Sequence, residues 1–363
     1  MRNGGQKEIN TVYHTKEKIN TRTYYHDKYL RRFDKINKKM MVSLTLILTL
    51  ISTISGCIQQ KETSENNKNI IYVGTTHADY KTIQKAIDAA HNGTKIIIEN
   101  GSYNELLVLN KTITLIGGDK NTTIINFTSN SNASQKAIID INAKNCSIEN
   151  LHITVSSNSF NAKGIFINSK NNTIKNNIIT KVSNGIELPQ FSESNIIINN
   201  EITNNQYGII TSYSTHNNIS NNILSNIQYD IYLTTDSNSN NVSFNIMNNA
   251  DYGIRIKGSE YNRVFTNCIQ NNKVGIYCCC SAQSNHFYNN TLVNNSEKNA
   301  KENSGLYNIW YDAPNGSGNY WSDYNGTDGN HDGIGDIPYE ITGAGNKDNH
   351  PLMTPPIDAP CNK

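Results

Sequence analysis

Between residues 160 and 295 the chain alternates short apolar and polar runs, and the same pattern returns at steps of 22 or 23 residues. Two apolar columns keep this step: Ile174, Ile197, Ile219, Val242, Val264 and Phe287, and then Ile179, Ile202, Leu224, Met247, Ile269 and Leu292. A third apolar column follows a turn residue that is glycine in five repeats of six: Ile165, Ile186, Ile209, Ile231, Ile254 and Ile276. Short apolar runs separated by turn residues indicate strands. The pattern therefore predicts three short strands in each repeat.

Asparagine occupies two further columns with the same spacing. They are Asn172, Asn195, Asn217, Asn240, Asn262 and Asn285, and Asn177, Asn200, Asn222, Asn245, Asn267 and Asn290. Asparagine tolerates the left-handed backbone of a sharp corner. Its amide can also donate to and accept from identical side chains above and below it. We therefore expect asparagine ladders at the corners of a stack whose interior is filled by the aliphatic columns.

A repeat of this length with three strands corresponds to one coil of a parallel β-helix, whereas leucine-rich repeats need a leucine consensus that is missing here. The predicted fold is all-β: a single-stranded right-handed parallel β-helix over residues 70–295. The segment "TIQKAIDAAHNG" (82–93) places Ile83, Ala86 and Ile87 on one helical face. It predicts a helical cap over the open edge of the first coil. Residues 296–363 are interpreted as a C-terminal cap with an Asp/Asn/Gly-rich loop.

The N-terminal part resembles an export signal. Lys38 and Lys39 precede an apolar run over 42–54 that is short for a membrane span, and Ser55-Gly56-Cys57 follows it. "ISGC" resembles a lipobox, so residues 40–56 are interpreted as a lipoprotein-type signal peptide with Cys57 as the lipidated residue; an uncleaved signal anchor is the alternative. Residues 1–39 are a basic extension, either a start-site artefact or a cytoplasmic tail, and 57–69 a flexible tether. We expect the remainder to lie on the extracellular face of the membrane.

Composition narrows the class of partner. The net charge is only +2 and charged residues make up 17% of the chain. No basic field exists to attract nucleic acid, and the charge is too low for a disordered chain. The seven cysteines form no CxxC pair, so neither a zinc ribbon nor a thioredoxin-like motif is indicated.

Two blocks resemble known families. "DYKTIQKAIDAAHNGTKIIIENGSYNE" is similar to the opening of pectin-lyase-like β-helix proteins. The "NNxIxNN…GI" coils and the terminal "GNYWSDYNGTDGNHDGIGDIPYEITGAGNKDNHPLM" resemble the NosD family. That resemblance spans about residues 70–354. It implies an exported β-helix protein described as copper-binding, in a family that includes many archaeal surface proteins.

The outward columns carry few candidate catalytic groups. Glu187 and Arg255 fall three coils apart, and Glu201 lies in another column without a second acid. No pair of carboxylates meets the ~5–9.5 Å that glycoside hydrolysis requires. The sequence therefore favours a binding or structural module for a glycan or the cell envelope over an enzyme. A polysaccharide lyase or hydrolase of the pectin-lyase type remains the alternative.

Three tyrosines define a candidate carbohydrate site. Tyr207, Tyr229 and Tyr252 each precede the turn residue, so they form a column over three coils. Stacked outward, these rings would offer a platform for sugars, and the expected partner is a cell-envelope glycan or a surface protein. A purely structural aromatic ladder is the other interpretation.

Two segments contain side chains of the kinds that bind metal ions. Asp328, Asn330, Asp332 and Asp336 take positions 1, 3, 5 and 9 of an EF-hand-like loop with Gly333 at position 6, which predicts weak calcium binding; a metal-free turn is the alternative. "CCC" at 278–280 is the soft-ligand cluster that copper(I) would prefer. Its first thiol is expected to point inward, and a copper-binding accessory role is the second alternative function.

Overall fold

The structure is a computed structural model, and it describes residues 69–128, 136–156, 162–303, 307–312 and 316–362. Residues 67–363 form one compact unit. Residues 1–68 lie outside the described residues, and with them the predictions for the basic extension, the signal peptide, Cys57 and nearly all of the tether.

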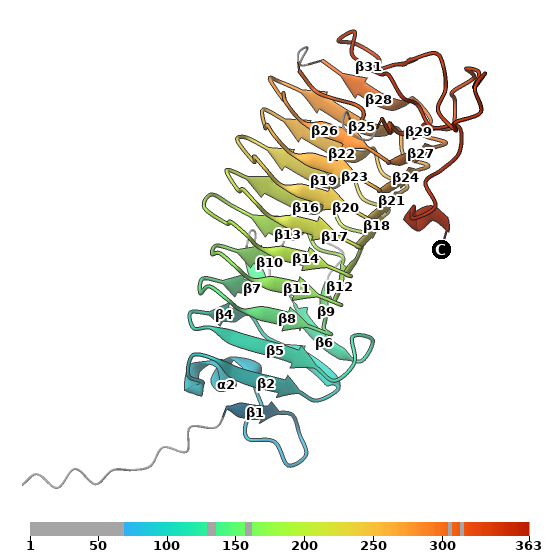
Figure 1. The fold of residues 1–363 in the computed structure, drawn as a ribbon. Coiled ribbons are helices and arrows are strands. Elements are labelled where there is room, and N and C mark those ends of the chain that lie inside the picture. Colours follow the sequence, from blue (N-terminus) through green and yellow to red (C-terminus); the bar gives the residue numbers. More distant parts are fainter. Residues whose placement is uncertain (1–68, 129–135, 157–161, 304–306, 313–315, 363) are drawn as a thin grey trace, which may run out of the picture. The chain divides into compact units, whose positions relative to one another are not determined.

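Three parallel sheets run through this unit, and each complete coil contributes one strand to each sheet (Figure 1). Sheet A contains β1 (Ile70–Val73), β2 (Thr94–Ile98), β5 (Ile113–Gly117), β8 (Ser147–Glu149), β11 (Thr173–Lys175), β14 (Ile196–Ile198), β17 (Asn218–Ser220), β20 (Asn241–Ser243), β23 (Arg263–Phe265) and β26 (His286–Tyr288). Sheet B contains β3 (Gly101–Asn104), β6 (Thr123–Phe127), β9 (His152–Val155), β12 (Ile178–Thr180), β15 (Glu201–Thr203), β18 (Ile223–Ser225), β21 (Ile246–Asn248), β24 (Cys268–Gln270), β27 (Thr291–Val293) and β29 (Tyr320–Trp321).

Sheet C has nine strands and carries the candidate ligand-binding face. It contains β4 (Leu107–Leu109), β7 (Ala137–Ile141), β10 (Lys163–Ile167), β13 (Asn184–Leu188), β16 (Tyr207–Ser212), β19 (Tyr229–Thr234), β22 (Tyr252–Lys257), β25 (Val274–Cys279) and β28 (Lys298–Glu302). Outside these sheets the structure has α2 (Ile83–Ala89), the antiparallel pair β30 (Tyr339–Glu340) and β31 (Lys347–Asp348), and a 3-10 turn at Pro360–Asn362. The predicted right-handed parallel β-helix is confirmed.

The aliphatic columns form the core, as the sequence predicted. Ile174 and Ile197 pair in register across β11 and β14, and both side chains are fully buried. Ile179 and Ile202 do the same across β12 and β15. Each coil therefore adds one inward residue per column to a continuous apolar interior, whose burial is the main favourable term in folding.

The two asparagine columns form the expected ladders, and the ladders have a direction. Asn195 donates its backbone N–H and its side-chain amide to Oδ1 of Asn217, at 2.9 and 3.1 Å. Asn217 repeats both bonds to Asn240, at 2.9 and 3.0 Å. The second column repeats the pattern, for example from Asn222 to Asn245 at 2.9 and 3.0 Å. Each amide thus donates toward the C-terminal end and accepts from the N-terminal side.

Each ladder ends on a buried carboxylate. The first continues from Asn285 to Asn308, whose side-chain amide donates to Glu302 Oε1. The second continues from Asn290 to Asn319, which donates to Asp348 Oδ2 through its backbone N–H at 2.7 Å. A carboxylate accepts without donating, so it satisfies the last donor of a one-way chain of amides.

Both ends of the coil stack are covered. Ile83, Ala86 and Ile87 of α2 are buried, and Gln84 exchanges two hydrogen bonds with the backbone of Val108 in β4. At the other end, buried Trp310 and Trp321 pack near each other with centroids 5.9 Å apart. A disulfide between Cys268 and Cys361 ties the C-terminal turn to β24, a pairing that the sequence did not predict.

The turn residue before the third apolar column is glycine in five coils, and in one coil it is Asp230. At Gly208 an added Cβ would lie 2.4 Å from the carbonyl oxygen of residue 230, which explains why this column favours glycine. Residue 230 itself is aspartate, fully buried, and neither of its carboxyl oxygens has a hydrogen-bond partner. Burial raises the pKa of Asp230 well above its usual value. The side chain therefore carries a desolvation penalty without compensation.

Candidate ligand-binding face

Two columns of side chains project from the outer face of sheet C. Strand register aligns the first as Val108, Asp140, Phe166, Glu187, Ile210, Tyr232, Arg255, Tyr277 and Lys301. The second aligns Tyr207, Tyr229 and Tyr252 in successive coils. The three tyrosines predicted from the sequence as a column are thus neighbours on one face.

The tyrosine rings stack on one another. The centroids of Tyr207 and Tyr229 are 5.2 Å apart with planes 7° from parallel, and those of Tyr229 and Tyr252 are 5.1 Å apart at 5°. Tyr232 and Tyr277 join the stack from the adjacent column, at 5.3 Å from Tyr229 and 5.6 Å from Tyr252. Within the stack the rings cover one another's faces, and the hydroxyl groups of Tyr229 and Tyr277 accept hydrogen bonds from Arg255 and Asn303.

Arg255 lies among these rings, a residue whose role the sequence did not reveal. Its guanidinium carbon is 5.3 to 5.6 Å from the centroids of Tyr229, Tyr232, Tyr252 and Tyr277. Its Nη1 donates to the Tyr229 hydroxyl at 3.0 Å, while Nε is buried without an acceptor. We call these five tyrosines and Arg255 the tyrosine–arginine cluster. Cation–π contacts between Arg255 and the four rings stabilise the cluster. The N–H group at Nε of Arg255 remains without an acceptor.

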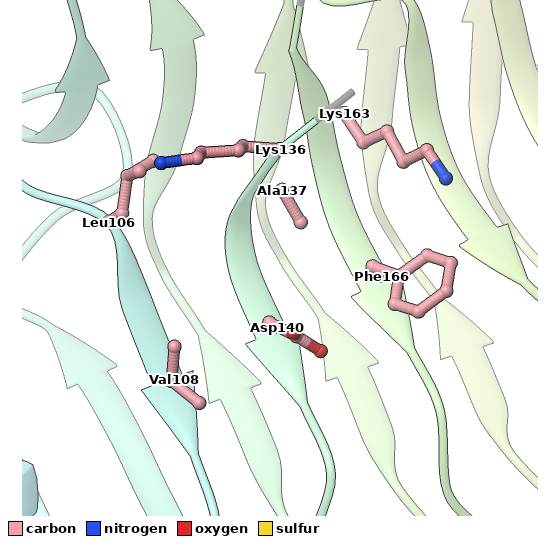
Figure 2. Close-up of a pocket in the computed structure, with 7 residues that line it drawn as sticks. All are labelled: Leu106, Val108, Lys136, Ala137, Asp140, Lys163 and Phe166. Atoms are coloured by element: carbon pink, nitrogen blue, oxygen red, sulfur yellow. The ribbon is translucent and has the colours of Figure 1, made fainter. Parts of the chain in front are cut away.

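A pocket opens on the same face, nearer the N-terminal end of sheet C. Its volume is about 360 Å³, and it is lined by Leu106, Val108, Lys136, Ala137, Asp140, Lys163 and Phe166. These residues belong to β4, β7 and β10 or directly precede β4 and β7, and Figure 2 shows their side chains along neighbouring strands. Lys163 lies 4.5 Å from the centroid of Phe166 and forms an ion pair of 2.9 Å with Glu187 Oε1. The pocket is apolar with a few charged groups, as small-molecule sites are.

Asp140 is the polar group in the pocket, and sequence reasoning missed it. Oδ1 of Asp140 is buried and has no hydrogen-bond partner. Burial raises the pKa of Asp140, a rise that a hydrogen bond with Asn142 and the charge of Lys163 oppose. The step from Asp140 to Phe166 is 26 residues rather than 22 or 23, so the column could not be extended backward by period alone. Strand pairing supplies the alignment.

Asp140 supplies a second carboxyl group in the outward column that contains Glu187. Asp140 and Glu187 occupy one column two coils apart, about 9.6 Å along the stack. Inverting glycosidases separate their carboxyl groups by about 6.5–9.5 Å. Glu187, however, is bound to Lys163 at 2.9 Å and also accepts from Asn184 at 2.5 Å. Its oxygens are already engaged by protein donors.

The Asp/Asn-rich loop brings its four predicted ligands into one turn. Asp328 accepts the backbone N–H groups of residues 332 and 333, at 3.2 and 2.9 Å, and Asp332 accepts that of residue 334 at 2.8 Å. Asp336 accepts from Gly329 at 2.8 Å. The carboxylates therefore close the loop on its own backbone. Calcium binding stays a prediction.

The cysteine cluster separates into inner and outer thiols. Cys278 is fully buried, as predicted; Cys279 is buried, with Sγ 3.9 Å from Nη2 of Arg255, and Cys280 is exposed. The Sγ atoms of Cys279 and Cys280 are 3.1 Å apart. In the described part of the chain, no group of three or more histidine, cysteine, aspartate or glutamate side chains could hold a metal ion. These residues do not fit a copper centre of that kind.

The coils, the ladders and the glycine-isoleucine strands define a right-handed parallel β-helix protein. The family model described as "Periplasmic copper-binding protein (NosD)" matches residues 118–326, more than half of the chain, so the chain belongs to the NosD family. No curated protein matches it. In the residues that the structure describes, no helix has the length and apolar character to span a membrane.

Solved structures share the fold. A complex of XylC with xylose is similar with a TM-score of 0.54 and 12% identity, over 66% of this chain and 68% of that one. Pectate lyase Pel9A gives a TM-score of 0.43 with 14% identity, over 64% and 78%. The A-module of mannuronan C-5 epimerase AlgE4 from Azotobacter vinelandii gives 0.40 with 15% identity, over 63% and 90%. At such identities the likeness concerns the fold alone.

Proposed function

We propose that this protein is an exported, lipid-anchored β-helix surface protein that binds glycan on the outer face of sheet C. The observation that carries the proposal is the tyrosine–arginine cluster, which gathers five aromatic rings and a partly unsatisfied guanidinium on one side of the coil stack. Aromatic rings with polar tips suit ligands that are apolar on their faces and hydroxylated at their edges.

The stacking geometry decides how a sugar would bind. Within the described residues, the ring contacts of Tyr207 are to Tyr229 and Tyr232, on its C-terminal side. Tyr207 therefore ends the aromatic stack there, with Asn184 before it in the same column, and we expect a sugar to contact the part of the Tyr207 ring that extends beyond Asn184. Farther along, a glycan would meet ring edges and phenol hydroxyls, which both donate and accept hydrogen bonds.

Tyr229→Ala is expected to weaken glycan binding at least tenfold, about 1.4 kcal/mol. The substitution removes the central ring of the stack and the acceptor of the 3.0 Å bond from Arg255. Binding of purified full-length protein to neutral oligosaccharides of defined length is measured by calorimetry. Thermal unfolding of each variant establishes that it is folded.

Tyr288→Ala is the matched control, because Tyr288 stacks on Phe265 and bonds to Arg263 on the outer face of sheet A. Equal losses in the two variants, or no glycan binding by the wild type, would contradict the proposal. The same samples are assayed for reducing and unsaturated sugars, and we expect none to be released. Release that disappears in Asp140→Asn would support the enzyme alternative instead.

Cys57→Ser is expected to abolish lipidation and release the protein from the membrane fraction. The reason is the Ser55-Gly56-Cys57 junction after a short apolar run. Mass spectrometry of the mature N-terminus and fractionation of cells provide the measurement. A membrane-bound variant with an intact N-terminus would support a signal anchor.

A further inference from the structure

The pocket of sheet C and the tyrosine–arginine cluster share one face, and the glycan-binding function proposed above uses only the cluster. We propose that the pocket seats the terminal unit of a linear, neutral glycan whose next units cross β13 and reach the cluster. This inference rests on the proposed function and specifies the ligand class and its position on the face.

The pocket lies at an end of this face. Sheet C begins at β4, and the backbone of Val108 in that strand is hydrogen-bonded to Gln84 of α2, at 2.8 and 3.4 Å. Going the other way, β10 is followed by β13 and then by β16, which carries Tyr207. Two coil steps, about 9.6 Å, separate the strand of Phe166 from that of Tyr207. A chain seated in the pocket therefore has one direction in which to extend along the sheet.

The lining suits a sugar ring. Phe166, Val108 and Leu106 supply apolar surface for the C–H face of a pyranose. Asp140 also lines the pocket, and its carboxyl group can accept a hydrogen bond from a sugar hydroxyl. The volume of about 360 Å³ lies at the small end of ligand pockets. These dimensions fit the end of a chain rather than several sugar units.

The charges favour a neutral glycan over an acidic one. Lys163 is already bound to Glu187 at 2.9 Å, and Arg255 donates to Tyr229 at 3.0 Å. The carboxylates of Asp140 and Glu187 stand in the column that a chain would follow. Lys136 also lines the pocket and carries the charge opposite to that of Asp140, while Lys163 is paired with Glu187. Together these four groups offer a uronic acid no net positive charge, whereas the hydroxyl groups of a neutral sugar can donate to the carboxylates.

The test compares neutral and acidic chains of increasing length on the full-length protein. The probes are β-1,4-linked glucose and xylose oligosaccharides and α-1,4-linked galacturonate oligomers, each of about two to eight units. Phe166→Ala and Asp140→Asn are expected to weaken binding of the longer neutral chains at least tenfold. Phe265→Ala, on the outer face of sheet A, is the matched control and should bind as the wild type does. Neutral chains with a bulky fluorophore at one end should bind about tenfold more weakly, and those labelled at the other end should bind normally.

Each outcome has a distinct meaning. If the pocket variants bind as the wild type while Tyr229→Ala is weakened, the terminal seat is overturned and the glycan-binding function stands. If both end-labelled chains bind like unlabelled ones, the pocket does not hold a chain end. Tighter binding of galacturonate oligomers would overturn the neutral class. Failure of every oligosaccharide to bind would remove the proposed function itself.

Discussion

Glu302→Gln is expected to lower the free energy of unfolding by about 2–4 kcal/mol. Glu302 is fully buried and accepts hydrogen bonds from three side chains: Asn308 at Oε1, and Trp310 and Asn346 at Oε2, at 3.1 and 2.9 Å. Glutamine keeps the shape but replaces one acceptor oxygen by an amide that donates. At least one buried donor would then face another donor, and an unsatisfied buried group costs more than the bond it lost.

Denaturant unfolding of the wild type and the variant measures this loss. Glu297→Gln serves as the control, because Glu297 is exposed in the same coil and should change stability by less than about 0.5 kcal/mol. If Glu302→Gln unfolds at the same denaturant concentration as Glu297→Gln, the carboxylate is not needed to terminate the ladder.

Asp230→Ala is expected to have the opposite effect and to raise the free energy of unfolding at pH 7 by about 1–3 kcal/mol. The fully buried carboxyl group has no hydrogen-bond partner on either oxygen, and five of the six equivalent positions carry glycine. Removing it discards a desolvation penalty, and the alanine methyl group occupies the place that Cβ of aspartate already fills.

The same substitution should alter the pH dependence of stability. Burial raises the pKa of Asp230 in the folded state above its unfolded value, so the folded protein binds the proton more tightly. The contribution of this group is therefore most favourable below the unfolded pKa and declines as pH rises toward the folded one. The stability gained in Asp230→Ala should shrink as pH is lowered from 7 to about 4. A difference that is constant with pH would show that Asp230 does not titrate in this way.

The regular coils could be predicted from the sequence because their side chains repeat a single environment. Ile174 and Ile197 occupy equivalent inward sites, and the same holds for each asparagine of a ladder. Periodicity weakens where insertions alter the step. Asn308 keeps the step of 23 from Asn285, but Asn319 follows Asn290 by 29 residues. Its place in the second ladder depends on a loop whose path the repeat does not encode.

The candidate site was predicted only in part, for a related reason. Tyr207, Tyr229 and Tyr252 repeat and were found by their spacing, whereas Arg255 and Asp140 each occur once in their column. The role of a residue that does not repeat depends on the side chains that surround it in the folded protein, and these cannot be identified from the repeat spacing. The link between Cys268 and Cys361 likewise joins residues 93 positions apart, and an export signal together with several cysteines was the available hint.

The direction of the asparagine ladders has a consequence for how such a protein can evolve. Each coil inside the ladders receives hydrogen bonds from one neighbour and passes the same bonds to the next. A duplicated coil that retains both asparagines would fit between two existing ones and leave Glu302 and Asp348 at the terminus. Duplication of the coding sequence for one coil could then lengthen the face of sheet C by about 4.8 Å per coil, and neither cap would need to change.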